Sequence, residues 1–111
     1  DEYSFVLAGR VGALLGDEVV YGEPGDFIFK PRGQWHTFWN AGDEPARILE
    51  IVSPAGFEKF FAEIAERPAD AGPPNPDELA AAGARYGVEV DFSSIPRLMQ
   101  EYGVFFGAPP Q

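Results

Sequence analysis

The fold is decided by residues 25–40, which read GDFIFKPRGQWHTFWN. A β-rich segment ends at Lys30, a Pro-x-Gly turn follows, and a second β-rich segment begins at His36. Proline and glycine at this spacing are typical of a tight turn between two strands. His36 is the only histidine in the chain, and most single histidines in strands only make structural hydrogen bonds. Its role therefore depends on the surrounding pattern.

The same alternation of short β-rich segments and turn residues extends over residues 3–52. It predicts strands at 3–8, 11–15, 19–21, 27–30, 36–40 and 46–52. Parallel neighbours would need crossover connections of about a dozen or more residues, and the intervening turns are shorter. The sequence therefore predicts a mainly β domain with antiparallel strands.

The hydrophobic period changes after Pro54. Apolar residues then recur at helical spacing, at Phe57, Phe60, Phe61 and Ile64, and predict an amphipathic helix that lies against the sheet. Asn75 and Glu78 resemble a capping box, which predicts a second helix over 76–86, and a third is expected over 95–102. We expect residues 1–54 to form the β domain. Residues 55–111 should form a helical extension packed on it, not an independent domain.

Composition limits the possible partners. The chain has 111 residues, with 18 acidic and 8 basic side chains and a net charge of −10. Such a chain is a poor candidate for binding nucleic acid or a membrane surface, because both attract basic residues. It has no cysteine, and no apolar run approaches the roughly 18 residues of a membrane span. With no signal peptide visible, the expected location is the cytoplasm, although a removed N-terminal segment could have carried one.

The spacing within residues 25–40 resembles the second conserved motif of the cupin superfamily, G-x5-P-x-G-x2-H-x3-N. Every fixed position matches: Gly25, Pro31, Gly33, His36 and Asn40. The first three alone would match by chance at roughly 2 in 10,000 starting points. Glu2, followed after six residues by Gly9, resembles the end of the first cupin motif. The likeness covers residues 2 to about 54, and the Phe-rich helix after it is similar to small, single-domain, quercetin-dioxygenase-like cupins.

This resemblance implies an antiparallel jelly-roll barrel in which the Pro-x-Gly turn closes a hairpin. It also implies that His36 and Glu2 are metal ligands, and that two further histidines lie upstream of Asp1. Three histidines and one glutamate would hold Fe, Mn, Ni, Cu or Zn in the full-length protein. Two ligands alone should bind such a metal weakly or not at all, since first-row sites normally have at least three protein ligands.

Strand alternation gives a set of pocket residues. If Glu2 and His36 face inward, residues two and four positions away on the same strands share that face. The cavity is then lined by Phe38, Ser4 and Val6, with Phe27 and Phe29 as further walls. The alternative for these residues is a plain core position, which is favoured for Val6 and stays open for Phe38. Glu50 is expected to point outward into solvent, and the alternative is that it forms part of a polar pocket.

The opposite strand faces carry large aromatic side chains. Trp35, Trp39, Tyr3 and Phe5 should point outward and need a cover. The helices or a second subunit could supply it. Because the cupins that this chain resembles are often dimers, we expect a homodimer.

Three functions fit the pattern. The first is a metal-dependent, dioxygenase-like enzyme acting on a small organic molecule, with Glu2 as ligand and as catalytic proton acceptor. The second is a non-enzymatic barrel that binds a small molecule or acts as a sensor, since cupins serve many functions on one fold. The third is a cupin isomerase or cyclase, because the sequence does not separate oxygen chemistry from proton transfer.

Overall fold

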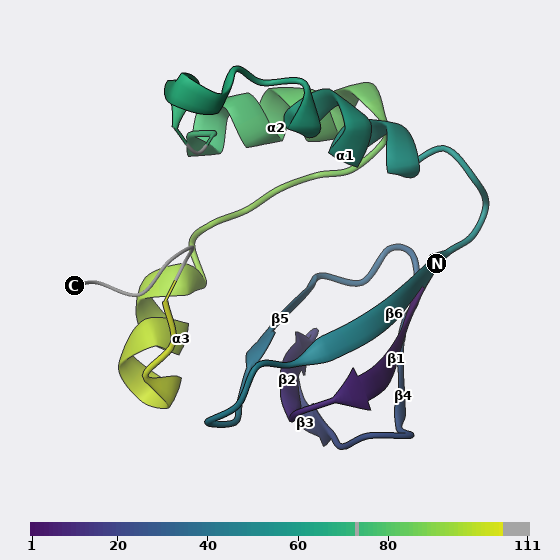
Figure 1. Cartoon of the computed structure of the whole chain (residues 1–111), viewed down its shortest axis with the longest axis vertical. Helices are drawn as coiled ribbons and strands as arrows, with labels where there is room; N and C mark the ends of the chain where they lie inside the picture. The colour runs from purple at the N-terminus through teal and green to yellow at the C-terminus, as the bar shows by residue number, and fades with distance from the viewer. Residues whose placement is uncertain (73, 106–111) are drawn as a thin grey trace. The chain divides into compact units, whose positions relative to one another are not determined.

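The computed structural model describes residues 1–72 and 74–105. The chain divides into two compact units, with the boundary between Pro54 and Ala55. The strands belong to the first unit and the helices to the second (Figure 1). We call them the β unit and the helical unit.

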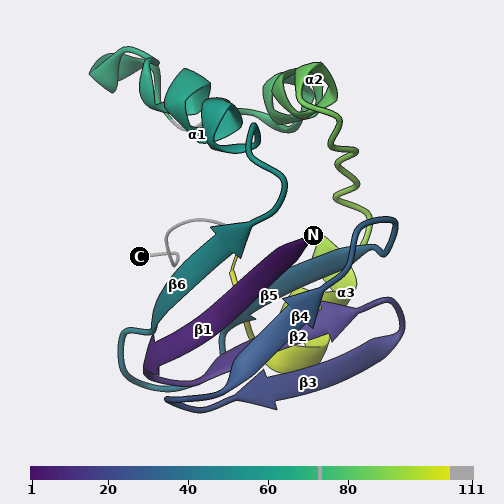
Figure 2. The same cartoon turned by 90° about the vertical axis from the view of Figure 1, so that its right-hand side faces the viewer.

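The β unit contains six strands, each within one residue of its predicted ends. They are β1 (Glu2–Ala8), β2 (Val11–Leu15), β3 (Glu18–Gly22), β4 (Phe27–Lys30), β5 (His36–Asn40) and β6 (Arg47–Val52). They form two three-stranded sheets, β4-β1-β6 and β3-β2-β5, and every pairing is antiparallel (Figure 2). The prediction of a mainly β, antiparallel fold followed by short helices is confirmed.

The Pro-x-Gly turn does not close a hairpin, which corrects the expectation drawn from the resemblance. The strands on either side of it, β4 and β5, belong to different sheets, so the turn carries the chain from one sheet to the other. Gly33 has a φ of 80°, a conformation that glycine adopts without steric cost, and the Gln34 amide donates to the Pro31 carbonyl at 3.4 Å. The turn thereby places His36 at the start of β5.

The core of the β unit lies between the two sheets. Its buried members are Val6, Val11, Ala13 and Ile28, and partly buried neighbours pack against them. Val11 and Ala13 lie two residues apart on β2 and so share its inner face, whereas Val6 and Ile28 share the inner faces of β1 and β4 with the buried polar residues Ser4 and Lys30.

Gly9 allows the chain to pass close to the segment before β6. It has a φ of 78°, and a Cβ atom there would lie 2.8 Å from both the Ala46 Cα and the Pro45 carbonyl oxygen. Those atoms belong to the backbone and cannot move aside cheaply. This explains why glycine occupies the position that resembles the end of the first motif.

The helical unit contains α1 (Glu58–Ala65), a short 3-10 helix (Ala69–Ala71), α2 (Pro76–Arg85) and α3 (Ile95–Tyr102). In and just before α1, the rings of Phe57, Phe60 and Phe61 pack with centroids 5.1 to 5.2 Å apart. The predicted cap of α2 is confirmed, because the Glu78 amide donates to the Asn75 side chain at 2.8 Å. That this unit packs on the strands stays a prediction.

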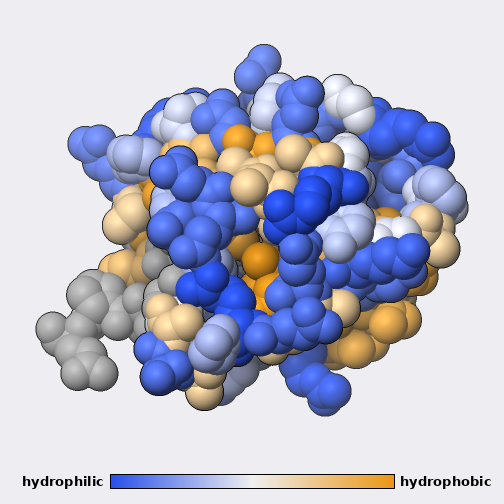
Figure 3. Space-filling view, turned by 90° about the horizontal axis from the view of Figure 1, so that it is seen from above, coloured by the Kyte–Doolittle hydropathy of each residue, from blue (hydrophilic) through white to orange (hydrophobic). Residues whose placement is uncertain are grey.

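Among the described residues, no helix combines the length and the apolar character that crossing a bilayer requires. In the space-filling view of Figure 3, hydrophilic side chains cover most of the visible face and apolar patches lie between them. This agrees with the excess of acidic residues in the composition.

Candidate functional site

A carboxylate and an imidazole meet inside the β unit. Glu2 Oε2 lies 2.9 Å from His36 Nε2, and the side chains are 20% and 27% exposed. Glu2 belongs to the β4-β1-β6 sheet and His36 to the β3-β2-β5 sheet, so this bond joins the two sheets. An ionised carboxylate only accepts hydrogen bonds, so Nε2 donates this one. Both groups keep enough exposure to be reached by a ligand.

Local contacts hold these two side chains at neighbouring strand ends. The Arg32 backbone amide donates to Asp1 Oδ1 at 2.9 Å, and the Arg32 guanidinium also contacts that carboxylate. The beginning of β1 is thereby tied to the turn that precedes β5. On the second sheet, His36 lies directly opposite Leu15, and the neighbouring Gly16 amide donates to the Trp35 carbonyl at 2.8 Å. Glu2 and His36 therefore meet because the start of β1 is held against the turn from which β5 begins.

Lys30 is buried next to this pair. It lies directly opposite Glu2 in the ladder between β1 and β4, and its side chain is 1% exposed. Its Nζ atom lies 2.5 Å from Glu50 Oε1 and 3.7 Å from Glu2 Oε2. The same atom lies 5.1 Å from the centre of the Phe38 ring, within cation–π range. A buried ammonium group is thus placed between two carboxylates.

Glu50 faces inward, which corrects the expectation that it points into solvent. It lies opposite Ser4 in the ladder between β1 and β6, and Ser4 Oγ donates to Glu50 Oε2 at 2.5 Å. Its other carboxylate oxygen takes the ion pair with Lys30. Two buried polar partners explain why a glutamate is tolerated on the inner face. We call Glu2, Ser4, Lys30, His36 and Glu50 the polar cluster.

The surroundings lower the pKa of Glu2. The largest cause is the hydrogen bond from His36, and the charges of His36 and Lys30 act in the same direction. Partial burial opposes them, because it raises a carboxyl pKa. Glu2 is therefore a carboxylate at neutral pH, with a proton donor bonded to it.

The structure brings some of the predicted pocket residues together. Ser4 and Val6 point inward on the same face of β1 as Glu2. Val6 is fully buried and belongs to the core, which is the plain structural role considered for it. Phe38 shares the inner face of β5 with His36 but is 51% exposed. It borders the polar cluster through its ring contact with Lys30.

Phe27 and Phe29 do not wall the interior, which corrects the prediction. They are 56% and 48% exposed and pack on Tyr3 on the outer face of the sheet. Because Lys30 pairs with Glu2, and Ile28 pairs with Ser4, these two take the inner face of β4. Successive residues of a strand point to opposite sides, so the phenylalanines between them must point out.

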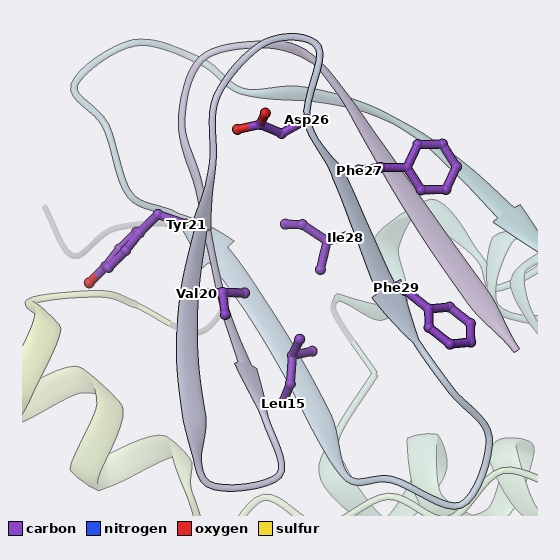
Figure 4. Close-up of a pocket in the computed structure, with 7 residues that line it drawn as sticks. All are labelled: Leu15, Val20, Tyr21, Asp26, Phe27, Ile28 and Phe29. Atoms are coloured by element: carbon purple, nitrogen blue, oxygen red, sulfur yellow. The ribbon is translucent and has the colours of Figure 1, made fainter.

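A cavity of about 280 Å³ opens between β3 and β4. It is lined by Leu15, Val20, Tyr21, Asp26, Phe27, Ile28 and Phe29. In Figure 4 the side chains of Leu15, Val20 and Ile28 point into the space between the strands, whereas both phenylalanine rings point away. Leu15 lies opposite His36 and Ile28 lies opposite Ser4. Two residues that line the cavity are therefore paired, in their ladders, with two members of the polar cluster.

The motif residues other than His36 shape turns. Gly25 has a φ of 94°, and its amide donates to the Val6 carbonyl at 2.9 Å. The Asn40 side chain accepts from the Gly42 amide at 3.0 Å and donates to the Glu44 carbonyl at 2.9 Å. It therefore organises the loop that leads to β6.

These residues do not by themselves fit a metal ion. Within residues 1–72 and 74–105, no group of three or more potential ligand side chains could hold one. Glu2 and His36 supply two donors that are bonded to each other, and the Lys30 ammonium lies beside the carboxylate. Sites for first-row metals normally have at least three protein ligands.

Sequence reasoning missed Lys30 as a site residue and assigned Glu50 to the wrong face. One signal could have found both. Residues directly opposite each other in an antiparallel ladder share a face of the sheet. Once Glu2 and Ser4 face inward, Lys30 opposite Glu2 and Glu50 opposite Ser4 must therefore face inward as well. Without the register between β1 and β4, a lysine next to Pro31 is expected to lie at the exposed end of a strand.

The comparisons with known proteins agree with the geometry. Residues 1–52 match the family model of the cupin domain. The chain is also 30% identical, over 87 residues, to the tetracenomycin polyketide synthase protein TcmJ of Streptomyces glaucescens. That match covers 78% of this chain and 54% of TcmJ, so the chain spans about half the length of this curated relative. No solved structure matches.

Proposed function

Because the chain belongs to the cupin superfamily, we propose that it binds a small organic molecule in the β unit and acts on it by proton transfer. Glu2 and His36 would be the acid–base pair. Such a reaction would be of the isomerase and cyclase type.

The contact between Glu2 and His36 carries this proposal. A carboxylate and an imidazole 2.9 Å apart can share a proton, and both are partly exposed. A general base must come within hydrogen-bond reach of the proton that it removes, so the proposal requires a ligand that enters between the sheets and approaches Glu2 or His36. The lowered pKa keeps Glu2 ionised at neutral pH, which is the form that can accept a proton, and it also makes this carboxylate a weaker base.

The relative suggests a substrate class. The name of TcmJ connects it with a polyketide synthase. Polyketide chains carry carbonyl groups at alternate carbons, and a carbon next to a carbonyl group loses a proton to a base to give an enolate. Enolisable or phenolic compounds are therefore the class that we propose for this site. The apolar wall formed by Leu15, Val20 and Ile28 suits the carbon skeleton of such a molecule.

Deuterium exchange tests the proposal. With 2-tetralone, an aromatic ketone, as probe in D2O, loss of the α-hydrogen signals in proton NMR gives the exchange rate. Glu2→Gln and His36→Gln should each slow the protein-catalysed exchange by about 10²- to 10⁴-fold. Glu18→Gln removes the same charge at an exposed position and should leave the rate unchanged. Equal exchange rates in the wild type and all variants would rule out the acid–base role of Glu2 and His36. Binding of tetralone without exchange would favour the non-enzymatic alternative.

A metal-dependent, dioxygenase-like reaction is the second candidate. The complete second motif and the inward-facing His36 favour it. It needs the two histidines that the resemblance implies upstream of Asp1, because the described residues offer two donors. Metal analysis of a chain extended by its natural upstream residues tests this candidate. Absence of bound metal, together with absence of an H-x-H sequence upstream, would rule it out.

A further inference from the structure

The polar cluster contains a cation of its own. We propose that the Lys30 ammonium is the resident cation of the β unit, where it takes the charge-neutralising role that the resemblance assigns to a divalent metal. Lys30 is then a positioning residue, because it acts through the Glu2 carboxylate that it holds.

The register of three strands puts this ammonium between two carboxylates. Lys30 on β4 lies opposite Glu2 on β1, and Glu50 on β6 lies opposite Ser4 on β1. The two charged neighbours of Nζ therefore approach it from two different strands, at 3.7 Å and 2.5 Å. The Phe38 ring, 5.1 Å away, adds a third favourable contact.

Burial makes this arrangement costly to disturb. Two carboxylates on the inner face of a barrel need a counter-charge, because removing ions from water without a partner is strongly unfavourable. With 1% exposure, the Lys30 side chain has little access to solvent and is held by these carboxylates. The Ser4 hydroxyl fixes the second oxygen of Glu50 and so orients the carboxylate toward Nζ.

A divalent ion on Glu2 would compete with Lys30. An ion bound to that carboxylate would lie within a few ångströms of the ammonium, and like charges at such distances repel strongly in a partly buried site. Metal binding therefore requires Lys30 to leave its place. This inference concerns the charge inside the β unit, and it holds whether or not Glu2 and His36 transfer a proton to a ligand.

Cobalt binding by the whole chain tests the proposal. Titration with Co²⁺, monitored by calorimetry and by visible absorption, should show negligible binding to the wild type. Lys30→Met should increase Co²⁺ affinity by roughly 100-fold, because it removes a repelling charge beside Glu2 and Glu50. Lys59→Met makes the same change at an exposed position in α1 and should have no effect. Tight, stoichiometric binding to the wild type, or equal affinity in wild type and Lys30→Met, would overturn the proposal.

A measurement on the wild type covers the case in which Lys30→Met does not fold. Lys30 and Lys59 are the two lysines of the chain, so each serves as a reference for the other. Acylation with an N-hydroxysuccinimide ester, followed by mass spectrometry, should label Lys30 at least about tenfold more slowly than Lys59. Addition of Co²⁺ should not change that ratio. Equal labelling, or release of Lys30 by Co²⁺, contradicts a resident ammonium. Neither readout depends on tetralone exchange, so failure of the proton-transfer proposal would be recognised separately.

Discussion

The two faces of the β4-β1-β6 sheet differ in an unexpected way. Its inner face carries a lysine and two glutamates in direct contact, whereas its outer face carries tyrosine, phenylalanine, leucine and isoleucine side chains. Sheets with one solvated face usually show the reverse order, apolar inside and polar outside. The inner face is therefore arranged around charged groups as well as a core, and the outer face presents apolar side chains that a further surface could cover.

The strongest test of this comparison is Lys30→Met. Removing one partner of a buried ion pair leaves an unpaired charge and should lower the free energy of unfolding by about 3–5 kcal/mol. Urea denaturation measures it, with Lys59→Met as the control at an exposed position. The double variant Lys30→Met/Glu50→Met should recover much of the loss, because a matched apolar pair needs no counter-charge. A loss below about 1 kcal/mol in the single variant contradicts a buried ion pair.

Neighbouring residues of β4 provide the second test. Ile28 is 6% exposed and Phe27 is 56% exposed, although they are adjacent in sequence. Ile28→Ala should cost about 2–5 kcal/mol, because it opens a cavity in the core. Phe27→Ala removes a larger side chain and should lower the stability of the monomer by less than about 1 kcal/mol, because that ring is largely solvated in a single chain. Thermal denaturation compares the two variants. A larger loss for Phe27→Ala would mean that the faces are assigned the wrong way round.

The pH dependence of stability provides the third test. The pKa of Glu2 in the folded chain lies below its ordinary value of 4.5, so the folded state holds this carboxylate ionised more strongly than the unfolded state does. Its stabilising contribution is therefore present above that ordinary value and is lost as the pH falls through the lower, folded pKa. Comparison of denaturation curves for wild type and Glu2→Gln between pH 7 and pH 3, roughly the range over which glutamate titrates, measures it. The two proteins should differ more at neutral pH than at acid pH, and a constant difference would contradict the linkage.

The outer face gives the smallest effect on stability. We propose that a second copy of the chain covers Phe27 and Phe29, which makes the protein a homodimer. Phe29→Lys should leave the free energy of unfolding of the monomer within about 1 kcal/mol and should weaken association, as measured by analytical ultracentrifugation. Phe61→Lys changes an exposed phenylalanine of the helical unit and serves as the control. Dissociation by Phe61→Lys alone would place the interface elsewhere.

The strands could be predicted from the sequence because their signals are local. Alternating apolar residues, together with Gly, Pro and Asp at the turns, placed all six strands within one residue of their ends. The meeting of Glu2 and His36 was reached only through the resemblance, since 34 residues separate them. No local pattern brings two such distant positions together.

The inner face of β4 could not be predicted for a related reason. Phenylalanine is more hydrophobic than lysine, so composition favours Phe27 and Phe29 as the inner residues. The pairing of β4 with β1 decides otherwise, because it puts Lys30 opposite Glu2. A shift of register by one residue would exchange the two faces, and register depends on contacts between distant segments.

The bond between Glu2 and His36 also has a mechanical consequence. It joins the two sheets at the first residues of β1 and β5. A ligand that forms its own hydrogen bond with Glu2 or His36 would break this bond between the sheets. Binding would then weaken the attachment of one sheet to the other. Faster amide hydrogen exchange in the backbone at the start of β1 and β5 would then report that a ligand has replaced this bond.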